Sequence, residues 1–176
     1  YGELGEFETA ESDFSTALEI ARRLEASEYG VYVNRGAMRV RRGALDEAIA
    51  DLNTAIELEP FEHQAYMNLA EAYRQQGDIA NAMRCVNDAI DRAPGAAQCY
   101  RYRAQIHLEE MDLTAALQEI DTAIQLAGPN ATADDHLQRG EILHGLKRYD
   151  QALAGYDQAL SMRPDEREHH KGRDVA

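Results

Sequence analysis

Hydrophobic residues recur at intervals of three and four along most of the chain, and short polar segments interrupt them. The segment from Glu62 to Pro94 shows this pattern most completely, with a first apolar stripe formed by Tyr66, Leu69, Ala70 and Tyr73. Residues with this spacing lie on one face of a helix. The break at 76–78 supplies a glycine for a tight turn and an aspartate that can cap the next helix. The segment therefore predicts two amphipathic helices joined by a turn, the second ending at Pro94.

This two-helix pattern repeats along the sequence, and alanines mark its register. One slot holds Ala10, Ala48, Ala82, Ala116 and Ala152, and a second slot, seven residues later, holds Ala17, Ala55, Ala89, Ala123 and Ala159. A small side chain is required where two helices cross closely. The chain is therefore predicted to be an array of helix pairs.

Three further slots resemble those of the tetratricopeptide repeat family, over about residues 1–164. The small residue of the first helix is Gly36, Ala70, Ala104 and Gly140. The aromatic residue one turn earlier is Tyr32, Tyr66 and Tyr100, with His136 departing from the pattern. The closing proline is Pro60, Pro94 and Pro164, and it moves to Pro129 in one repeat. The resemblance implies an all-α, right-handed superhelical solenoid of antiparallel helix pairs, with four full repeats after a half repeat.

The expected boundaries follow from these slots. A half repeat covers 1–28, the repeats cover 29–62, 63–96, 97–132 and 133–164, and a polar C-terminal tail covers 165–176. The first unit is expected to be incomplete, as in a fragment, with residues 1–5 forming the tail of a first helix and Glu6 to about Ala26 the second.

Two departures from the usual period predict local features. The first period is 38 residues instead of 34, which predicts a long helix through 20–24 with Ser27 capping the next one. A later period of 36 places two extra residues at 128–131, and Thr132 with Asp135 then resembles a capping box.

Composition excludes several classes of function. With 32 acidic and 18 basic residues the formal net charge is −14, which argues against a nucleic-acid ligand. The charge favours solubility and is compatible with a basic partner, although a solvated acidic surface is the simpler interpretation. No apolar run is long enough to span a membrane, and no signal peptide is visible at the first residue. Cys85 and Cys99 match no metal or redox motif and are interpreted as small packed hydrophobes in a reducing, cytoplasmic setting.

No enzyme signature is present. The sequence has no phosphate-binding loop, no HExxH motif and no nucleophile elbow, so no catalytic residue, metal ligand or cofactor is predicted. His136 and His144 are eight residues apart, whereas a helical metal pair prefers four, and both are interpreted as surface or partly packed residues.

The family resemblance places one face of the first helices along a concave groove. The residue two before the small slot is then predicted to point into it, namely Asn34, Asn68, Tyr102 and Gln138. Side-chain amides both donate and accept hydrogen bonds, so such a row suits the backbone of an extended peptide, and ordinary polar surface is the alternative interpretation. The full predicted peptide-binding set is Asn34, Met67, Asn68, Glu71, Arg74, Arg101, Tyr102, Gln105, Gln138 and Glu141. Arg74 and Arg101 are expected to meet a ligand carboxylate, and Glu71 and Glu141 a basic side chain.

Arginine also recurs beside the small slot, at Arg35, Arg103 and Arg139. We interpret these residues as structural, with guanidinium groups reaching acids such as Asp51 or Glu119 on a neighbouring helix. An anion-binding track is the alternative. The clamp of family members that bind chaperone tails needs lysines and an arginine in slots that this chain does not fill.

The predicted function is a non-catalytic scaffold that binds a peptide segment of a protein partner in the groove. Two alternatives remain open. The first is a structural module whose exposed end faces form homo-oligomers. The second is the regulatory arm of a larger multidomain protein or enzyme.

Overall fold

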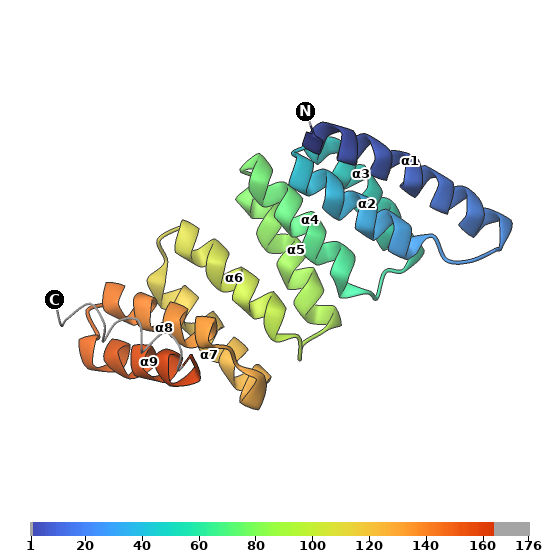
Figure 1. Cartoon of the computed structure of the whole chain (residues 1–176). Helices are drawn as coiled ribbons and strands as arrows, with labels where there is room; N and C mark the ends of the chain where they lie inside the picture. The colour runs from blue at the N-terminus through green and yellow to red at the C-terminus, as the bar shows by residue number, and fades with distance from the viewer. Residues whose placement is uncertain (1, 164–176) are drawn as a thin grey trace. The chain divides into compact units, whose positions relative to one another are not determined.

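The computed structural model describes residues 2–163, with side chains from Phe7 onward, so Tyr1, Pro164 and the predicted tail at 165–176 lie outside the described residues. This part of the chain contains α-helices, one short 3₁₀ helix and no strand (Figure 1), which confirms the all-α prediction. The elements are α1 (Gly2–Arg23), α2 (Tyr29–Arg42), α3 (Leu45–Leu58), α4 (His63–Gln76), α5 (Ile79–Arg92), α6 (Ala97–Glu109), α7 (Leu113–Ala127), η1 (Gly128–Asn130), α8 (Ala133–Gly145) and α9 (Tyr149–Met162).

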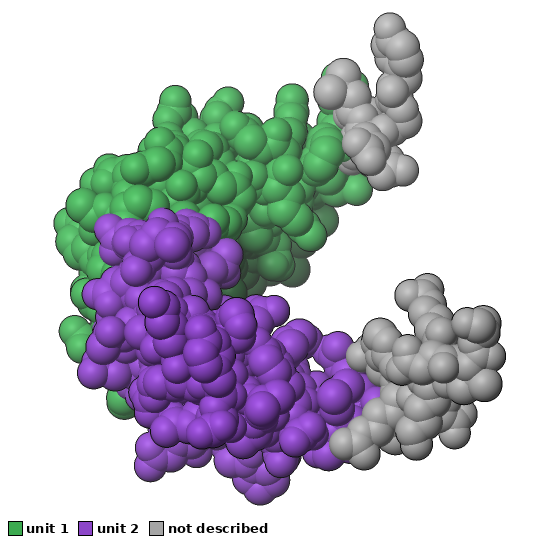
Figure 2. Space-filling model, turned by 90° about the vertical axis from the view of Figure 1, so that its left-hand side faces the viewer, with its two compact units in different colours: residues 1–94 green, residues 95–176 purple. Residues whose placement is uncertain are grey.

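The chain divides into two compact units, residues 1–94 and residues 95–176, coloured green and purple in Figure 2. In the first unit α2 pairs with α3 and α4 with α5, while α1 lies beside α2 and α3 packs on α4. In the second unit α6 pairs with α7, α8 pairs with α9, and α7 packs on α8. Each unit is therefore a stack of helix hairpins, each packed on the next.

Small side chains lie where the paired helices cross. Every alanine in the two repeated slots from Ala48 onward is at most 8% exposed. A Cβ built on Gly36 would lie 2.7 Å from the Cγ atom of Leu52, and one on Gly140 would lie 2.7 Å from the ring of Tyr156. At these crossings the facing helix leaves no room for a larger residue.

The turns within the hairpins use one backbone shape with different residues. Gly43 and Gly77 end α2 and α4 with φ of 81° and 80°. The equivalent positions in the second unit hold Met111 and Lys147, both with φ of 61°. A left-handed backbone costs a residue with a Cβ atom roughly 1 kcal/mol, so these two turns are strained where the glycine turns are not.

Side-chain caps begin α5 and α8 where the sequence predicts them. The carboxylate of Asp78 accepts a hydrogen bond from the backbone N–H of Asn81 at 3.0 Å. Thr132 and Asp135 form the predicted capping box: the Thr132 hydroxyl accepts from the Asp135 N–H, and Asp135 accepts from the Thr132 N–H. The extra residues before this box form η1.

The first helix differs in part from the prediction. It is long, as expected, with 22 residues against 13 to 15 in the others. The expected separate tail at residues 1–5 is wrong, because α1 runs without a break from Gly2, and one interior glycine costs a helix only about 1 kcal/mol. The helix ends at Arg23, before the predicted Ala26, because Glu25 takes a φ of 53° and the Ala26 N–H turns back to the Ala21 carbonyl.

Ser27 lies one residue before the cap position of α2, which is Glu28. Its hydroxyl accepts a 3.3 Å hydrogen bond from the Tyr29 N–H and donates to Glu59 at 2.6 Å. Ser27 therefore joins the start of α2 to the end of α3, and the prediction that it occupies the cap position is wrong, because Glu28 holds that position.

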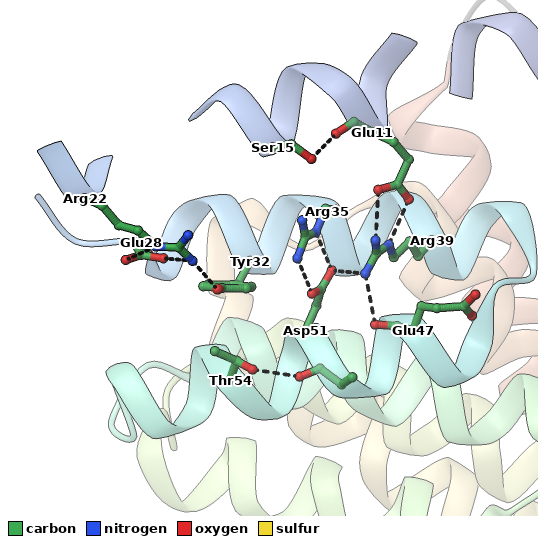
Figure 3. A network of polar contacts seen from close by, with 11 residues as sticks. Glu11, Ser15, Arg22, Glu28, Tyr32, Arg35, Arg39, Glu47, Asp51 and Thr54 are labelled. Atoms are coloured by element: carbon green, nitrogen blue, oxygen red, sulfur yellow. Dashed lines mark hydrogen bonds and ion pairs between the residues drawn. The ribbon is translucent and has the colours of Figure 1, made fainter. Parts of the chain in front are cut away.

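Ion pairs link neighbouring helices in the first unit. The Arg35 guanidinium donates to both carboxylate oxygens of Asp51, at 2.8 and 2.7 Å. Arg39 contacts the same Asp51 and also binds Glu11 of α1 through two hydrogen bonds of 2.8 and 2.9 Å, so that α1, α2 and α3 share one network (Figure 3). The hydrogen bond from Arg39 holds the pKa of Glu11 below its usual value.

The second unit repeats this arrangement. Arg103 of α6 pairs with Glu119 of α7 at 2.9 Å, and Arg139 of α8 pairs with Asp121 of α7 at 2.5 Å. Together with Arg35, these contacts confirm the interpretation of the recurring arginines as groups that reach acids on a neighbouring helix.

A further ion pair joins α6 to α8. The guanidinium of Arg101 donates to both oxygens of Asp135, at 2.6 and 2.8 Å, and only 4% of the Asp135 side chain is exposed. Burial alone raises the pKa of Asp135, but the hydrogen bonds from Arg101 and Thr132 outweigh it and hold the pKa below its usual value. The backbones of α6 and α8 approach less closely than those of α2 and α4. This pair is therefore a principal link between the two first helices.

We expect Met111→Gly to raise the free energy of unfolding by about 1 kcal/mol, because glycine adopts a positive φ without strain. Glu110, the preceding residue, has a φ of −82° and is equally exposed to solvent, so Glu110→Gly is the matched control. That control should lower the free energy by about 0.5 kcal/mol. Urea unfolding followed by circular dichroism measures both changes. Equal destabilisation by the two variants would show that the left-handed turn is not strained.

We expect Asp135→Asn to lower the free energy of unfolding by about 2 kcal/mol at neutral pH, because it leaves Arg101 without its ion pair. The lowered pKa of Asp135 means that its contribution is complete above the usual carboxyl pKa of about 4 and is lost as the pH falls through its folded-state value. The difference between variant and wild type should therefore narrow below about pH 4.

Asp134→Asn is the control for this comparison. Asp134 is adjacent, 74% exposed and, among the described residues, paired with Arg163 at the surface, so its loss should change the stability by less than about 0.5 kcal/mol. Similar urea midpoints for the two variants at neutral pH would contradict a stabilising role for the buried pair.

Candidate functional site

The described part of the chain was searched first for metal-binding groups, reactive thiols and membrane-spanning helices. Among these residues no group of three His, Cys, Asp or Glu side chains is placed to hold a metal ion. Cys85 and Cys99 are buried free thiols, at 2% and 0% exposure, and burial raises the pKa of Cys85 to about 11 and also raises that of Cys99. A helix long and apolar enough to cross a membrane is not found in residues 2–163. The candidate site is therefore sought on the surfaces of the first helices.

The larger candidate surface is an open hollow of about 530 Å³ between α6 and α8. Three of the predicted peptide-binding residues, Arg101, Gln138 and Glu141, line it together with Leu137. The hollow also takes in the start of α8, at Thr132, Asp134 and Asp135. We refer to it below as the α6/α8 hollow.

The charges of the α6/α8 hollow are only partly neutralised within the chain. Arg101 is held by Asp135, so the guanidinium predicted to meet a ligand carboxylate is already paired. Asp134 is paired with Arg163 at 2.6 Å. Glu141 is exposed and makes no hydrogen bond or ion pair within the described residues. The hollow thus presents a free carboxylate beside Leu137, which is 37% exposed, and the amide of Gln138.

A second open hollow, of about 290 Å³, lies between α2 and α4 in the first unit. Ala37, Val40 and Arg41 line it from α2, and Asn68 and Glu71 line it from α4. This α2/α4 hollow brings together two predicted residues, Asn68 and Glu71, with three that were not predicted.

The acid in the α2/α4 hollow is occupied by its own helix. Glu71 accepts two hydrogen bonds from Arg74, at 2.8 and 2.9 Å, and one from Gln75 at 2.6 Å. Arg74 and Glu71 therefore pair with each other within α4, and the predicted contacts of Arg74 with a ligand carboxylate and of Glu71 with a basic side chain stay predictions.

The remaining predicted site residues lie outside these two hollows. Met67 is only 6% exposed, so nearly all of its side chain packs in the protein and little is available to a ligand. Asn34 and Gln105 are exposed on α2 and α6, and Tyr102 is half-buried on α6. Asn68 and Gln138 therefore line separate hollows, one in each unit, and the row of amides stays a prediction.

Arg41 is the residue that the sequence pattern missed most clearly. It lies five positions after Gly36, in the last turn of α2, whereas the prediction considered the middle of each first helix. Asp134 and Asp135 were missed as site residues for a similar reason, because they belong to the start of α8. The repeat pattern could have indicated these residues, because side chains at both ends of a first helix, and not only those at its middle, lie beside the gap to the next first helix.

Solved structures with the same fold are numerous, and their sequences have diverged widely. The crystal structure of TTC0263, a thermophilic TPR protein in Thermus thermophilus, is 21% identical, covers 99% of this chain and 93% of that chain, and has a TM-score of 0.71. BtubC from P. vanneervenii is 20% identical, with 94% and 76% covered and a TM-score of 0.78. MamA is 17% identical, with 94% of each chain covered and a TM-score of 0.75. At these identities the likeness shows the fold alone.

Sequence comparison identifies the family. No protein with a curated description matches the chain significantly. Profiles of the tetratricopeptide repeat match residues 33–97, 76–131 and 136–166. These matches cover well over half of the chain and coincide with the helix hairpins from α2 to α9. The chain belongs to the tetratricopeptide repeat family.

Proposed function

We propose that the chain is a non-catalytic scaffold that binds an extended segment of a partner protein against its first helices. Membership of the tetratricopeptide repeat family indicates a protein-interaction scaffold. The observation that carries the finer proposal is the pair of hollows between successive first helices, each lined by predicted binding residues. An open, mixed polar and apolar groove is suited to a peptide rather than to a small substrate.

The polar groups of the two hollows support contact with a peptide backbone. Asn68 in the α2/α4 hollow and Gln138 in the α6/α8 hollow are amides, which both donate and accept hydrogen bonds. Ala37, which is half-buried, and Leu137, which is 37% exposed, add apolar surface beside them. Within each hollow a backbone stretch and one or two side chains of a partner can be held together.

Self-association is the second candidate, and the outer face of α9 favours it. Leu117 of α7 is 7% exposed because α8 covers it, and Leu113 of α7 also packs in that core. The equivalent residues of α9 are Leu153, which is 61% exposed, and Tyr149, which is 53% exposed. An apolar face that is covered in one repeat and open in another is a candidate contact between copies of the chain.

The proposed groove is tested by affinity capture from a native lysate with quantitative mass spectrometry. The test variant replaces with alanine three residues of the hollows, Asn68, Gln138 and Glu141. The control replaces the same residue types on exposed positions of second helices, Asn53, Gln118 and Glu57. We expect partners to be retained by the control and weakened at least about tenfold by the test variant, as for removal of several central contacts.

Equal capture by the two variants would contradict the groove as the binding surface. Light scattering then decides the second candidate. A mass that rises with protein concentration in the wild type and stays constant in Leu153→Glu would assign the contacts to the α9 face.

A further inference from the structure

The α2/α4 hollow carries one cation that nothing in the described residues neutralises. Arg41 is exposed, and its guanidinium makes no ion pair or hydrogen bond there. The two arginines that precede the exposed Arg41 and Arg42 in α2 differ, because Arg35 and Arg39 both bind Asp51 and Arg39 also binds Glu11. Arg41 is thus the guanidinium of α2 that lines a hollow and is available to a ligand.

The other polar groups of the hollow do not oppose an anion. The carboxylate of Glu71 is held by Arg74 and Gln75, so its charge is largely offset. The side-chain oxygen of Asn68 accepts from Gln64 at 3.4 Å, which leaves the Asn68 amide N–H groups to donate. An arriving carboxylate therefore meets a free guanidinium and a free amide donor.

The floor of the hollow is apolar. Ala37 is half-buried and lies about one turn from Arg41 on α2, and Val40 next to Arg41 is almost fully covered, at 4% exposure. A ligand group that places its charge on Arg41 also places its neighbouring atoms on Ala37. A ligand that carries an aliphatic group next to its acidic group fits this guanidinium and apolar lining better than an acidic group alone.

We propose that the α2/α4 hollow recognises an acidic side chain of the partner segment, next to an aliphatic residue, with Arg41 as the residue that determines specificity. This inference rests on the proposed function, because it assigns a chemistry to one part of the peptide-binding surface. The chain as a whole carries a charge of −14, so the acidic side chain is selected by the local guanidinium and not by the overall field.

The test uses random peptides of about 12 residues, a length suited to an extended groove ligand, displayed on phage and selected against the full chain. Fluorescence anisotropy then gives the affinity of each selected peptide and of versions in which Asp or Glu is replaced by Asn or Gln. We expect the wild type to enrich Asp or Glu beside Leu, Ile or Val, and Arg41→Gln to bind these peptides about tenfold more weakly, as for loss of a charge-assisted hydrogen bond. Arg41→Glu should shift the selection toward Lys and Arg.

Arg42→Gln is the matched control. Arg42 is the neighbouring exposed arginine, it does not line the hollow, and it lies close enough to Glu11 to contribute to lowering the pKa of that carboxyl. Its loss should leave the affinity of the selected peptides within about twofold of wild type, apart from a small effect of general charge.

The outcomes separate this inference from the proposed function. Enriched peptides without an excess of acids, or peptides that bind Arg41→Gln as well as wild type, would overturn the role of Arg41 while leaving peptide recognition intact. Selected peptides that shift amide resonances only outside α2, α4, α6 and α8 in heteronuclear NMR spectra, or a selection that enriches no peptide, would overturn both.

Discussion

The close crossing of paired helices at small side chains is the constraint on which the rest of the structure depends. At Gly36 and Gly140 the facing helix is so close that a Cβ atom would clash with it. Buried alanines occupy the other crossings. Because each pair crosses at the same residues, each first helix has the same orientation relative to its second helix. The residues two before and one after the small slot, Asn68 with Glu71 and Gln138 with Glu141, then lie at the gaps between successive first helices. The two hollows are products of this packing.

Much of the fold could be predicted because it follows from local rules that repeat. The alanine slots, the Asp78 cap, the capping box at Thr132 and the structural role of Arg35 each depend on spacings of a few residues or of one hairpin. The continuous α1 could not be predicted, because the repeat pattern suggested a break at residues 1–5, while helix propagation across Gly5 costs little. The strain at Met111 and Lys147 could not be predicted either, because neither residue is of a type that usually adopts a positive φ.

The candidate site was predictable in outline only. Position along a helix identifies the face on which a residue lies, and the helices that carry Asn68, Gln138 and Glu141 could be named on that basis. The partner that a charged side chain selects depends on its spatial neighbours. Arg74 pairs with Glu71 on its own helix, whereas Arg101 pairs with Asp135, which is 34 residues away in the sequence. Met67 is buried. Arg41 emerged as the available cation because its neighbours had already bound the nearby acids.

Asp135 has two roles that are usually assigned to different residues. It closes the capping box that starts α8, and it anchors Arg101 across the α6/α8 hollow. The point at which α8 starts and the separation of the two first helices are therefore set by a single carboxylate. The connecting segment at 128–131, which holds the two residues beyond the usual period, positions that carboxylate relative to α6. Loop length therefore acts on the spacing of α6 and α8: adding or removing a residue in the connection would change the width of the α6/α8 hollow without changing the side chains of α6 and α8 that line it.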